Sequence, residues 1–371
     1  GLTLARGNVM HGQPGKAGTT ACEFRAEQAL TLWPLALTQA EYFTHAADLP
    51  MAALPEWRKY RSGLRLRLRT TAGLDFSQLD LQDLRLHCAG LDEVAYRLHE
   101  LLGGHTLGVL VLPTKRPAAW HEALDGDCVD LVGFDDDQAL LPETLQGLEG
   151  YRLLQEYFAF PQRYLFVDLA GIGDALRRHG GDEVDIVILF TRLDNALLQS
   201  VDASSLALHC VPAINLLERR CDRIHVANDT SDFHIVPDRT RPMDFEVHTV
   251  TEVMGFGTGV QAEWRFLPFY NAFHTEQQGH NAYYACQREP RLMSQVQQRD
   301  GPRTAYIGTE VYLSVVDAQE APYPDELRQI GVRALCTNRD LPVLMPVGNP
   351  KGDLTLAETA PVKNVQVIKG P

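Results

Sequence analysis

Two segments of this chain repeat the same order of strand, helix and strand, and this repeat constrains the fold more than any other feature. LRLHCAGLDEVAYRLHELLGGHTLGVLVL lies within residues 64–112, and YLFVDLAGIGDALRRHGGDEVDIVILF lies within residues 163–190. Ala89-Gly90 in the first segment corresponds to Ala170-Gly171 in the second, 81 residues further along. A strand, a helix and a second strand typically form a parallel pair with a right-handed crossover. We therefore predict duplicated βαβ units that share one sheet or form two packed sheets.

The first repeat contains two clear changes of hydrophobic period. Residues 64–69 alternate strictly between Leu and Arg, which predicts a strand with one buried and one solvated face. Leu91, Val94, Leu98 and Leu101 then fall at helical spacing. Residues 107–112 form an almost continuous apolar run, which is typical of a strand covered on both faces.

After about residue 218 the helical period disappears, and short apolar runs alternate with turn residues. We expect strands at 224–226, 233–236, 245–253, 260–266, 282–288, 309–316, 332–336 and 362–368. The glycine-rich segment 255–259 is expected to be a hairpin turn, and the polar segment 271–279 a long loop. The sequence thus predicts a strand-dominated α+β chain. An α+β domain with the two βαβ units would span residues 1–218, and a mainly-β sandwich or barrel-like domain residues 219–371.

The composition limits the classes of partner. The 371 residues carry a formal net charge of −14, which argues against binding to nucleic acid or to an anionic membrane surface. No apolar run approaches the length that spans a bilayer, so we expect no direct membrane insertion. The seven cysteines are odd in number and form no CxxC pair, which indicates a reducing compartment and hence the cytoplasm.

The patterns that usually carry chemistry are incomplete in this sequence. Gly15-Lys16 is followed by Ala17, whereas a phosphate loop needs Ser or Thr there. The histidines lack metal-ligand spacing, and no GxSxG serine motif is present. Cys210 and Cys336 are the candidate thiols, but both lie in apolar strands where burial raises the pKa of a thiol. We therefore expect no enzyme activity, no cofactor, no metal and no small-molecule substrate.

Several dense segments mix aromatic, proline and polar residues at the ends of expected strands. Such residues either shape a corner of the fold, by fixing turns, or anchor an interface through Tyr157, Phe158 or Arg339. The candidate residues are Glu156, Tyr157, Phe158, Pro161, Pro212, Asn215, Glu218, Pro237, Asp238, Asn338, Arg339 and Asp340.

The same segments resemble the TssF (VasA or ImpG) family of type VI secretion baseplate subunits. The similarity lies in EYFAFPQRYLFVDLAG, HCVPAINLLER, FHIVPDRTRPMDFEVHTVTEV and CTNRDLP, in this order. The segments GTTACEFRAEQALTLWPLAL and GFDDDQALLP are similar to the family as well, so the resemblance covers nearly the whole chain. Leu217 departs from the pattern, because an aromatic residue is expected there.

The resemblance implies a structural role in a contractile injection machine that resembles a phage tail. It implies a wedge in which two TssF copies bind one TssG, with TssK, TssE, a VgrG hub and a second TssF copy as further partners. Family members are longer at both ends, so we expect this chain to be a central fragment. Two alternatives stay open: a hydrolase-type enzyme, and a phage-like receptor or carbohydrate-binding module.

Overall fold

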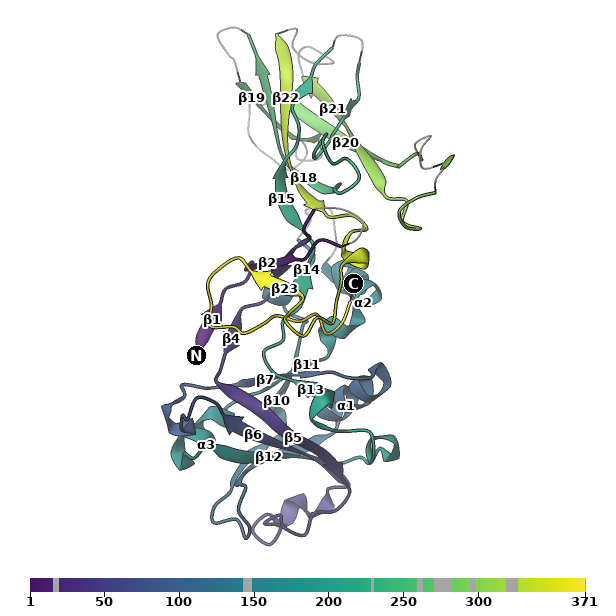
Figure 1. The fold of residues 1–371 in the computed structure, drawn as a ribbon. Helices are drawn as coiled ribbons and strands as arrows, with labels where there is room; N and C mark the ends of the chain where they lie inside the picture. The colour runs from purple at the N-terminus through teal and green to yellow at the C-terminus, as the bar shows by residue number, and fades with distance from the viewer. Residues whose placement is uncertain are drawn as a thin grey trace. The chain divides into compact units, whose positions relative to one another are not determined.

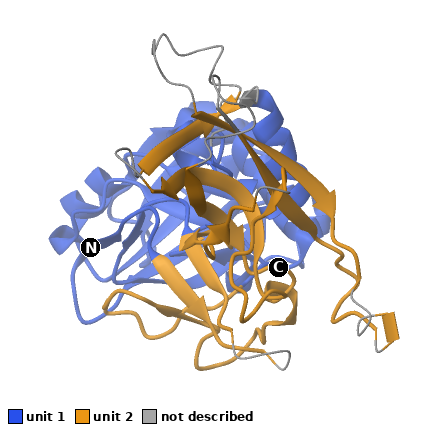
Figure 2. Cartoon of the chain, turned by 90° about the horizontal axis from the view of Figure 1, so that it is seen from above, with its two compact units in different colours: residues 1–8, 26–213, 368–370 blue, residues 9–25, 214–367, 371 orange. Residues whose placement is uncertain are grey.

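The computed structural model describes residues 1–15, 20–142, 149–227, 230–258, 263–269, 282–293, 298–299, 301–317 and 326–370. The chain divides into two compact units, shown in blue and orange in Figure 2. Unit 1 contains residues 1–8, 26–213 and 368–370, and unit 2 contains residues 9–25, 214–367 and 371. The division after residue 213 differs from the expected boundary at 218. Residues 9–25 also lie in unit 2 although the sequence placed them in the first domain, because they pair with a strand from near the end of the chain.

In the residues that the structure describes, unit 1 contains two larger sheets, a small ribbon and three α-helices (Figure 1). The five-stranded sheet has the order β5 (Leu35–Phe43), β6 (Ser62–Thr70), β12 (Glu183–Phe190), β8 (Thr106–Pro113), β9 (Glu122–Asp125). The four-stranded sheet has the order β10 (Val129–Val132), β11 (Phe166–Leu169), β7 (Leu84–Cys88), β13 (Leu206–Ala207). The ribbon pairs β1 (Leu2–Leu4) with β4 (Leu30–Leu32), and the helices are α1 (Asp92–Gly104), α2 (Glu149–Ala159) and α3 (Ile172–His179).

The two repeated segments each contribute one strand to each larger sheet. In the first, α1 connects β7 to β8, and in the second, α3 connects β11 to β12. The expected parallel pairs are therefore wrong: β7 pairs antiparallel with β11, and β8 pairs antiparallel with β12. Leu86 lies opposite Val167, its equivalent 81 residues further along, as an approximate two-fold axis through this pair requires. The duplicated units thus form two packed sheets, and in each unit the helix connects a strand of one sheet to a strand of the other.

A single apolar core joins the two sheets of unit 1. Leu64, Leu66 and Leu68 of β6 are fully buried in it, as their alternation predicts. Leu86 of β7 and Val167 of β11 contribute from the other sheet. The outer face of the five-stranded sheet carries a second cluster, and it consists of Phe43, Leu49, Trp57, Leu110, Leu112, Val187 and Leu189. Strands β8 and β12 are thus covered on both faces, which explains their continuous apolar sequences.

The arginine face of β6 is paired with carboxylates rather than left to solvent. Asp185 of β12 is completely buried and accepts hydrogen bonds from Arg67 at 2.8 and 3.1 Å and from Arg116 at 2.8 Å. Arg116 also donates to Asp48 at 2.7 Å, and Asp48 accepts from Arg65 at 2.8 Å. These ion pairs connect two strands of the sheet with the segments that contain Asp48 and Arg116.

Unit 2 is mainly β. A curled sheet has the order β15 (Leu217–Arg220), β22 (Leu327–Thr337), β18 (Glu246–Gly257), β19 (Glu263–Pro268), β20 (Ala282–Pro290), β21 (Thr309–Asp317), β17 (Phe233–His234), with β16 (Ile224–His225) also paired to β22. Strands from both halves of this sheet contribute residues to one core, among them Val253 of β18 and Leu313 of β21. A smaller sheet has the order β14 (Ala213–Ile214), β3 (Glu23–Ala26), β2 (Val9–Gly12), β23 (Leu354–Leu356). The predicted strand-dominated α+β class is confirmed.

Three expectations for the second half need correction or lie outside the described part. Residues 362–368 form no strand and make one isolated bridge, between Val365 and Leu354. Gly255 and Gly257 belong to β18 itself, where the rings of Phe266 and Trp264 occupy the space that a Cβ would need. The loop expected at 271–279 lies outside the described residues.

The buried carboxylate of Asp185 gives a first prediction. In an Asp185→Asn variant, Arg67 and Arg116 lose their shared anion, so we expect the free energy of unfolding to fall by about 3 kcal/mol. Glu183→Gln, on the same strand, removes the partner of the more exposed Arg69 and should cost less than about 1 kcal/mol. Urea unfolding measures both values. An equal fall in the free energy of unfolding for the two variants would contradict the prediction that the buried carboxylate costs more to remove.

The buried imidazole of His87 gives a prediction about pH. His87 packs edge-on against Phe166 with the ring centroids 4.4 Å apart, and burial lowers its pKa from 6.5 to about 4. Below about pH 6.5 the unfolded chain therefore takes up a proton that the folded chain excludes. We expect this residue to reduce the free energy of unfolding by about 3 kcal/mol as the pH falls to 4. Urea titrations over this pH range should show a smaller fall in the free energy of unfolding for His87→Gln than for the wild type, and the wild-type fall for the exposed His45→Gln. A fall for His87→Gln equal to that of the wild type would contradict the prediction.

Candidate functional site

Helix α2 of unit 1 turns its apolar side toward solvent. Tyr151, Leu154 and Phe158 follow one another at helical spacing, and they are 62%, 53% and 80% exposed. The opposite side carries Arg152 and Glu156, whose side chains are nearly completely buried. An ordinary surface helix has the reverse arrangement, with its apolar stripe against the core. The orientation of α2 therefore calls for a specific cause.

The cause is the pairing of Glu156 with buried donors. Its side chain accepts hydrogen bonds from the backbone N–H groups of Leu140 at 3.0 Å and Leu141 at 2.8 Å, and forms an ion pair with Arg163. Arg163 is fully buried and donates to the carbonyl of Gln138 at 2.6 Å. Two backbone hydrogen bonds to Glu156, the bond from Arg163 to Gln138 and the buried ion pair together hold α2 against residues 138–141 with its polar side inward.

Aromatic rings extend the exposed surface beyond the helix. The ring of Tyr157 lies 5.6 Å from that of Phe158 and 6.2 Å from that of Tyr164. Tyr164 in turn contacts Phe134, with 5.1 Å between the ring centroids, and Phe134 is exposed. We call Tyr151, Leu154, Tyr157, Phe158 and Phe134 the α2 surface. Exposed apolar residues gathered in this way are typical of a protein-binding surface.

The structure separates the four candidate residues of this segment. Glu156 is buried and holds the helix, and Pro161 begins the 3₁₀ turn Pro161–Tyr164, where its missing N–H costs no hydrogen bond. Tyr157 and Phe158 are exposed, so their role as interface anchors stays a prediction. The sequence reasoning missed Tyr151, Leu154 and Phe134. The helical spacing of residues 151, 154 and 158 is the signal that could have identified the first two.

A second group of candidates forms a polar corner in unit 2. The side-chain amide of Asn215 donates to the side-chain oxygen of Asn338 at 2.8 Å, and the backbone N–H of Asn338 donates back to Asn215 at 2.7 Å. Both residues also bond the backbone of Glu23 in β3, at 2.7 and 2.9 Å. Asn338 is buried. These amides connect the small sheet of unit 2 to the ends of β15 and β22.

The residues that follow Asn338 complete this corner. Asp340 is buried and accepts from Arg303 and from the hydroxyl of Thr304 at 2.7 Å. Burial opposes ionisation, but the bonds from Arg303 and Thr304 outweigh it and hold the pKa of Asp340 below its ordinary value. Arg339 has a φ of 58° and directs its guanidinium to the carbonyl of Ile307 and toward Glu246. Its side chain is buried, which favours the structural interpretation of Arg339 over the interface one.

The remaining candidates are structural or exposed. Asp238, after Pro237, accepts from the backbone N–H groups of Thr240 and Arg241 at 2.9 and 3.2 Å and pairs with Arg219. The bond from the Thr240 hydroxyl is the main cause that lowers the pKa of Asp238. Pro212 is buried and its carbonyl accepts from the N–H of Glu27 at 3.0 Å, whereas Glu218 is exposed on β15. None of these contacts assembles an acid, a base and a nucleophile at one point.

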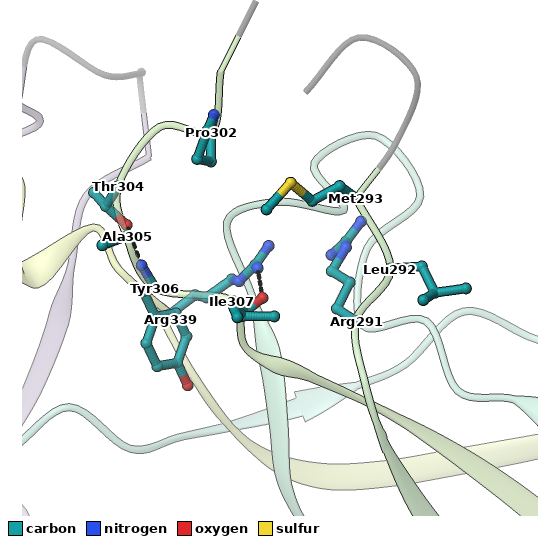
Figure 3. Close-up of a pocket in the computed structure, with 9 residues that line it drawn as sticks. All are labelled: Arg291, Leu292, Met293, Pro302, Thr304, Ala305, Tyr306, Ile307 and Arg339. Atoms are coloured by element: carbon teal, nitrogen blue, oxygen red, sulfur yellow. Dashed lines mark hydrogen bonds between the residues drawn. The ribbon is translucent and has the colours of Figure 1, made fainter. Parts of the chain in front are cut away.

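A hollow in unit 2 lies beside the polar corner (Figure 3). Arg291, Met293, Tyr306, Ile307 and Arg339 are among the residues that line it, and Figure 3 shows Arg339 directed to Ile307. Its volume of about 30 Å³ has room for about one water molecule. Sites for small molecules are typically ten times larger or more, so this hollow does not fit a substrate.

The candidate thiols do not form an activated nucleophile. Burial raises the pKa of the Cys210 thiol to about 12, and a hydrogen bond with Cys221 together with burial raises that of Cys336. A thiol with a raised pKa is a poor nucleophile at neutral pH. Among the described residues, no group of three or more His, Cys, Asp or Glu side chains is placed to hold a metal ion. Within the same part of the chain, no helix is both long and apolar enough to span a membrane.

Comparisons with known proteins identify the family. The family model described as "Type VI secretion system, TssF" matches residues 1–371. "Type VI secretion system component TssF1" of Pseudomonas aeruginosa is 47% identical over 373 residues, a match that covers 100% of this chain and 60% of that protein. The chain belongs to the TssF family, and it spans about 60% of the length of this curated relative.

A solved structure shares the fold. It is described as the type VI secretion system TssK-TssF-TssG baseplate subcomplex, determined by cryo-electron microscopy. The TM-score is 0.70 at 22% sequence identity, and the match covers 98% of this chain and 61% of that chain. At this identity the likeness establishes the fold, which agrees with the α+β class assigned above.

The contrast between Glu156 and Phe158 gives a prediction about stability. Glu156→Ala leaves Arg163 buried without its anion and removes the side-chain oxygen that accepts from two backbone N–H groups, so we expect the free energy of unfolding to fall by about 3 to 5 kcal/mol. Phe158→Ser changes a side chain that is 80% exposed and should alter stability by less than about 0.5 kcal/mol. Urea unfolding followed by circular dichroism measures both. A large loss for Phe158→Ser would show that its ring packs in the folded chain.

Proposed function

We propose that this chain is a scaffold segment of a type VI secretion baseplate subunit and binds TssG and TssK. The observation that carries the proposal is the α2 surface, an apolar surface held outward by a buried ion pair. Membership of the TssF family supports the role, and so does the structural neighbour, which is a TssK-TssF-TssG baseplate subcomplex.

The same features favour a structural role over catalysis. Strong ion pairs and reciprocal amide bonds fix the candidate polar residues in corners of the fold, and the pKa values of the candidate thiols Cys210 and Cys336 are raised. A scaffold needs such rigid corners, whereas a catalytic group must reach a substrate. We propose that the chain is not an enzyme and that it acts in the cytoplasm. Contacts with TssE, VgrG and a second TssF copy, and the ratio of two TssF per TssG, stay predictions.

The carbohydrate-binding alternative also requires exposed aromatic residues. Tyr151, Tyr157 and Phe158 meet that requirement. Sugars, however, stack on the faces of aromatic rings, and Leu154 lies in the middle of the α2 surface. A convex ridge of mixed aromatic and aliphatic side chains fits an apolar groove of a protein better.

Co-expression tests the proposed function. The chain is produced together with TssG and, separately, with TssK from the same gene cluster, and each mixture is separated by size exclusion. We expect the chain to elute with at least one of them as a single larger species. A longer TssF from the same cluster is the control. Elution of both TssF forms as free protein, with TssG and TssK in separate fractions, would contradict the baseplate role.

A further inference from the structure

We infer that the α2 surface docks a protein partner that presents apolar side chains flanked by lysine or arginine. The inference rests on the proposed function and names the chemistry of the partner that this surface takes. Burial of an apolar side chain is favourable, and α2 leaves four mostly exposed: Tyr151, Leu154, Tyr157 and Phe158. That free energy is available to a partner that covers them.

The inward side of α2 shows that this exposure is not caused by a loosely attached helix. Glu156 and Arg163 are both buried, and together they bond residues 138–141. The hydroxyl of Tyr164 also donates to the carbonyl of Leu153 in α2 at 3.2 Å. The apolar ridge is thus presented on a fixed support, which reduces the entropy lost on binding.

The chemistry of the ridge indicates a protein partner. Tyr and Phe are enriched at the centres of protein interfaces, where they fill apolar pockets. Tyr151, Leu154 and Phe158 recur at the spacing by which a helix packs into a groove between helices of another protein. Tyr157 and Phe134 widen this ridge, and both contact the ring of Tyr164.

The charge beside the ridge selects among possible occupants. Asp135, Asp136 and Asp137 are exposed in the loop that contacts α2, and Arg152 neutralises Asp136 at 2.5 Å. Asp135 directly follows Phe134 of the α2 surface and accepts from the side-chain amide of Gln138 at 3.2 Å, and the charge of Asp137 acts on Arg85. The loop thus forms a negative rim beside Phe134, in a chain of net charge −14. A second copy would bring the same acidic loops to one interface, and an anionic membrane would be repelled. A partner with basic residues around an apolar groove complements both features.

Binding measurements with purified TssG and TssK as probes test this assignment. The double variant Tyr151→Ser/Phe158→Ser should bind the partner found by co-expression at least about 30-fold more weakly, because two central aromatic anchors are lost. The double variant Val343→Ser/Val347→Ser, at two exposed apolar residues of unit 2, is the matched control and should bind as the wild type does. Urea midpoints establish that all variants fold.

Charge reversal tests the acidic rim separately. Asp135→Lys/Asp137→Lys should weaken binding about tenfold at low salt and much less at high salt, because screening removes the rim's contribution. The wild-type affinity should fall as salt rises. A variant with unchanged affinity at low salt would overturn the basic character of the partner.

The outcomes separate this inference from the proposed function. A wild-type chain that binds neither TssG nor TssK would overturn the proposed function, and this inference with it. Binding by the wild type that the Tyr151→Ser/Phe158→Ser variant retains would overturn this inference alone. Light scattering gives the third result: a wild-type dimer that this variant converts to a monomer would identify a second copy as the occupant and overturn the inference.

Discussion

The antiparallel pairing of two strand–helix–strand units is the constraint on which unit 1 depends. Strands β7 and β11 pair in one sheet, and β8 and β12 pair in the other, so each unit must cross the core through its helix. Leu86 and Val167, which are equivalent in the two units, lie opposite each other. Neither unit could bury its apolar faces alone. The two sheets therefore depend on each other to bury their inner faces in one core.

Around this core, buried carboxylates fix the segments that the sheets do not hold. Asp185 connects β12 to Arg67 and Arg116, and Glu156 connects α2 to Arg163 and to residues 138–141. An isolated buried ion would be too costly, so each carboxylate requires its arginine in one particular position. Such pairs add little net stability compared with apolar packing, but the loss of one partner leaves an uncompensated buried charge. Residues 134–142 and α2 thereby obtain a defined orientation.

The sequence predicted the parts of the fold that local patterns determine. The alternation at Leu64, Leu66 and Leu68 predicted a strand and its buried face. The direction of pairing between strands depends on the partner strand, which no local period reveals, and the parallel prediction was wrong for that reason. Gly255 and Gly257 were assigned to a turn because their role in β18 depends on the distant rings of Phe266 and Trp264.

The candidate site was predictable in its residues but not in its geometry. The segment around Glu156, Tyr157 and Phe158 was identified as a corner or an anchor, and the structure gives these neighbouring residues different environments. Helical periodicity specifies which residues share a side of α2, but it does not specify which side faces solvent. That choice is made by Arg163, seven residues after Glu156, whose burial requires an anion. The ion pair therefore holds the polar side of α2 inward, and the apolar residues on the opposite side of the helix face solvent.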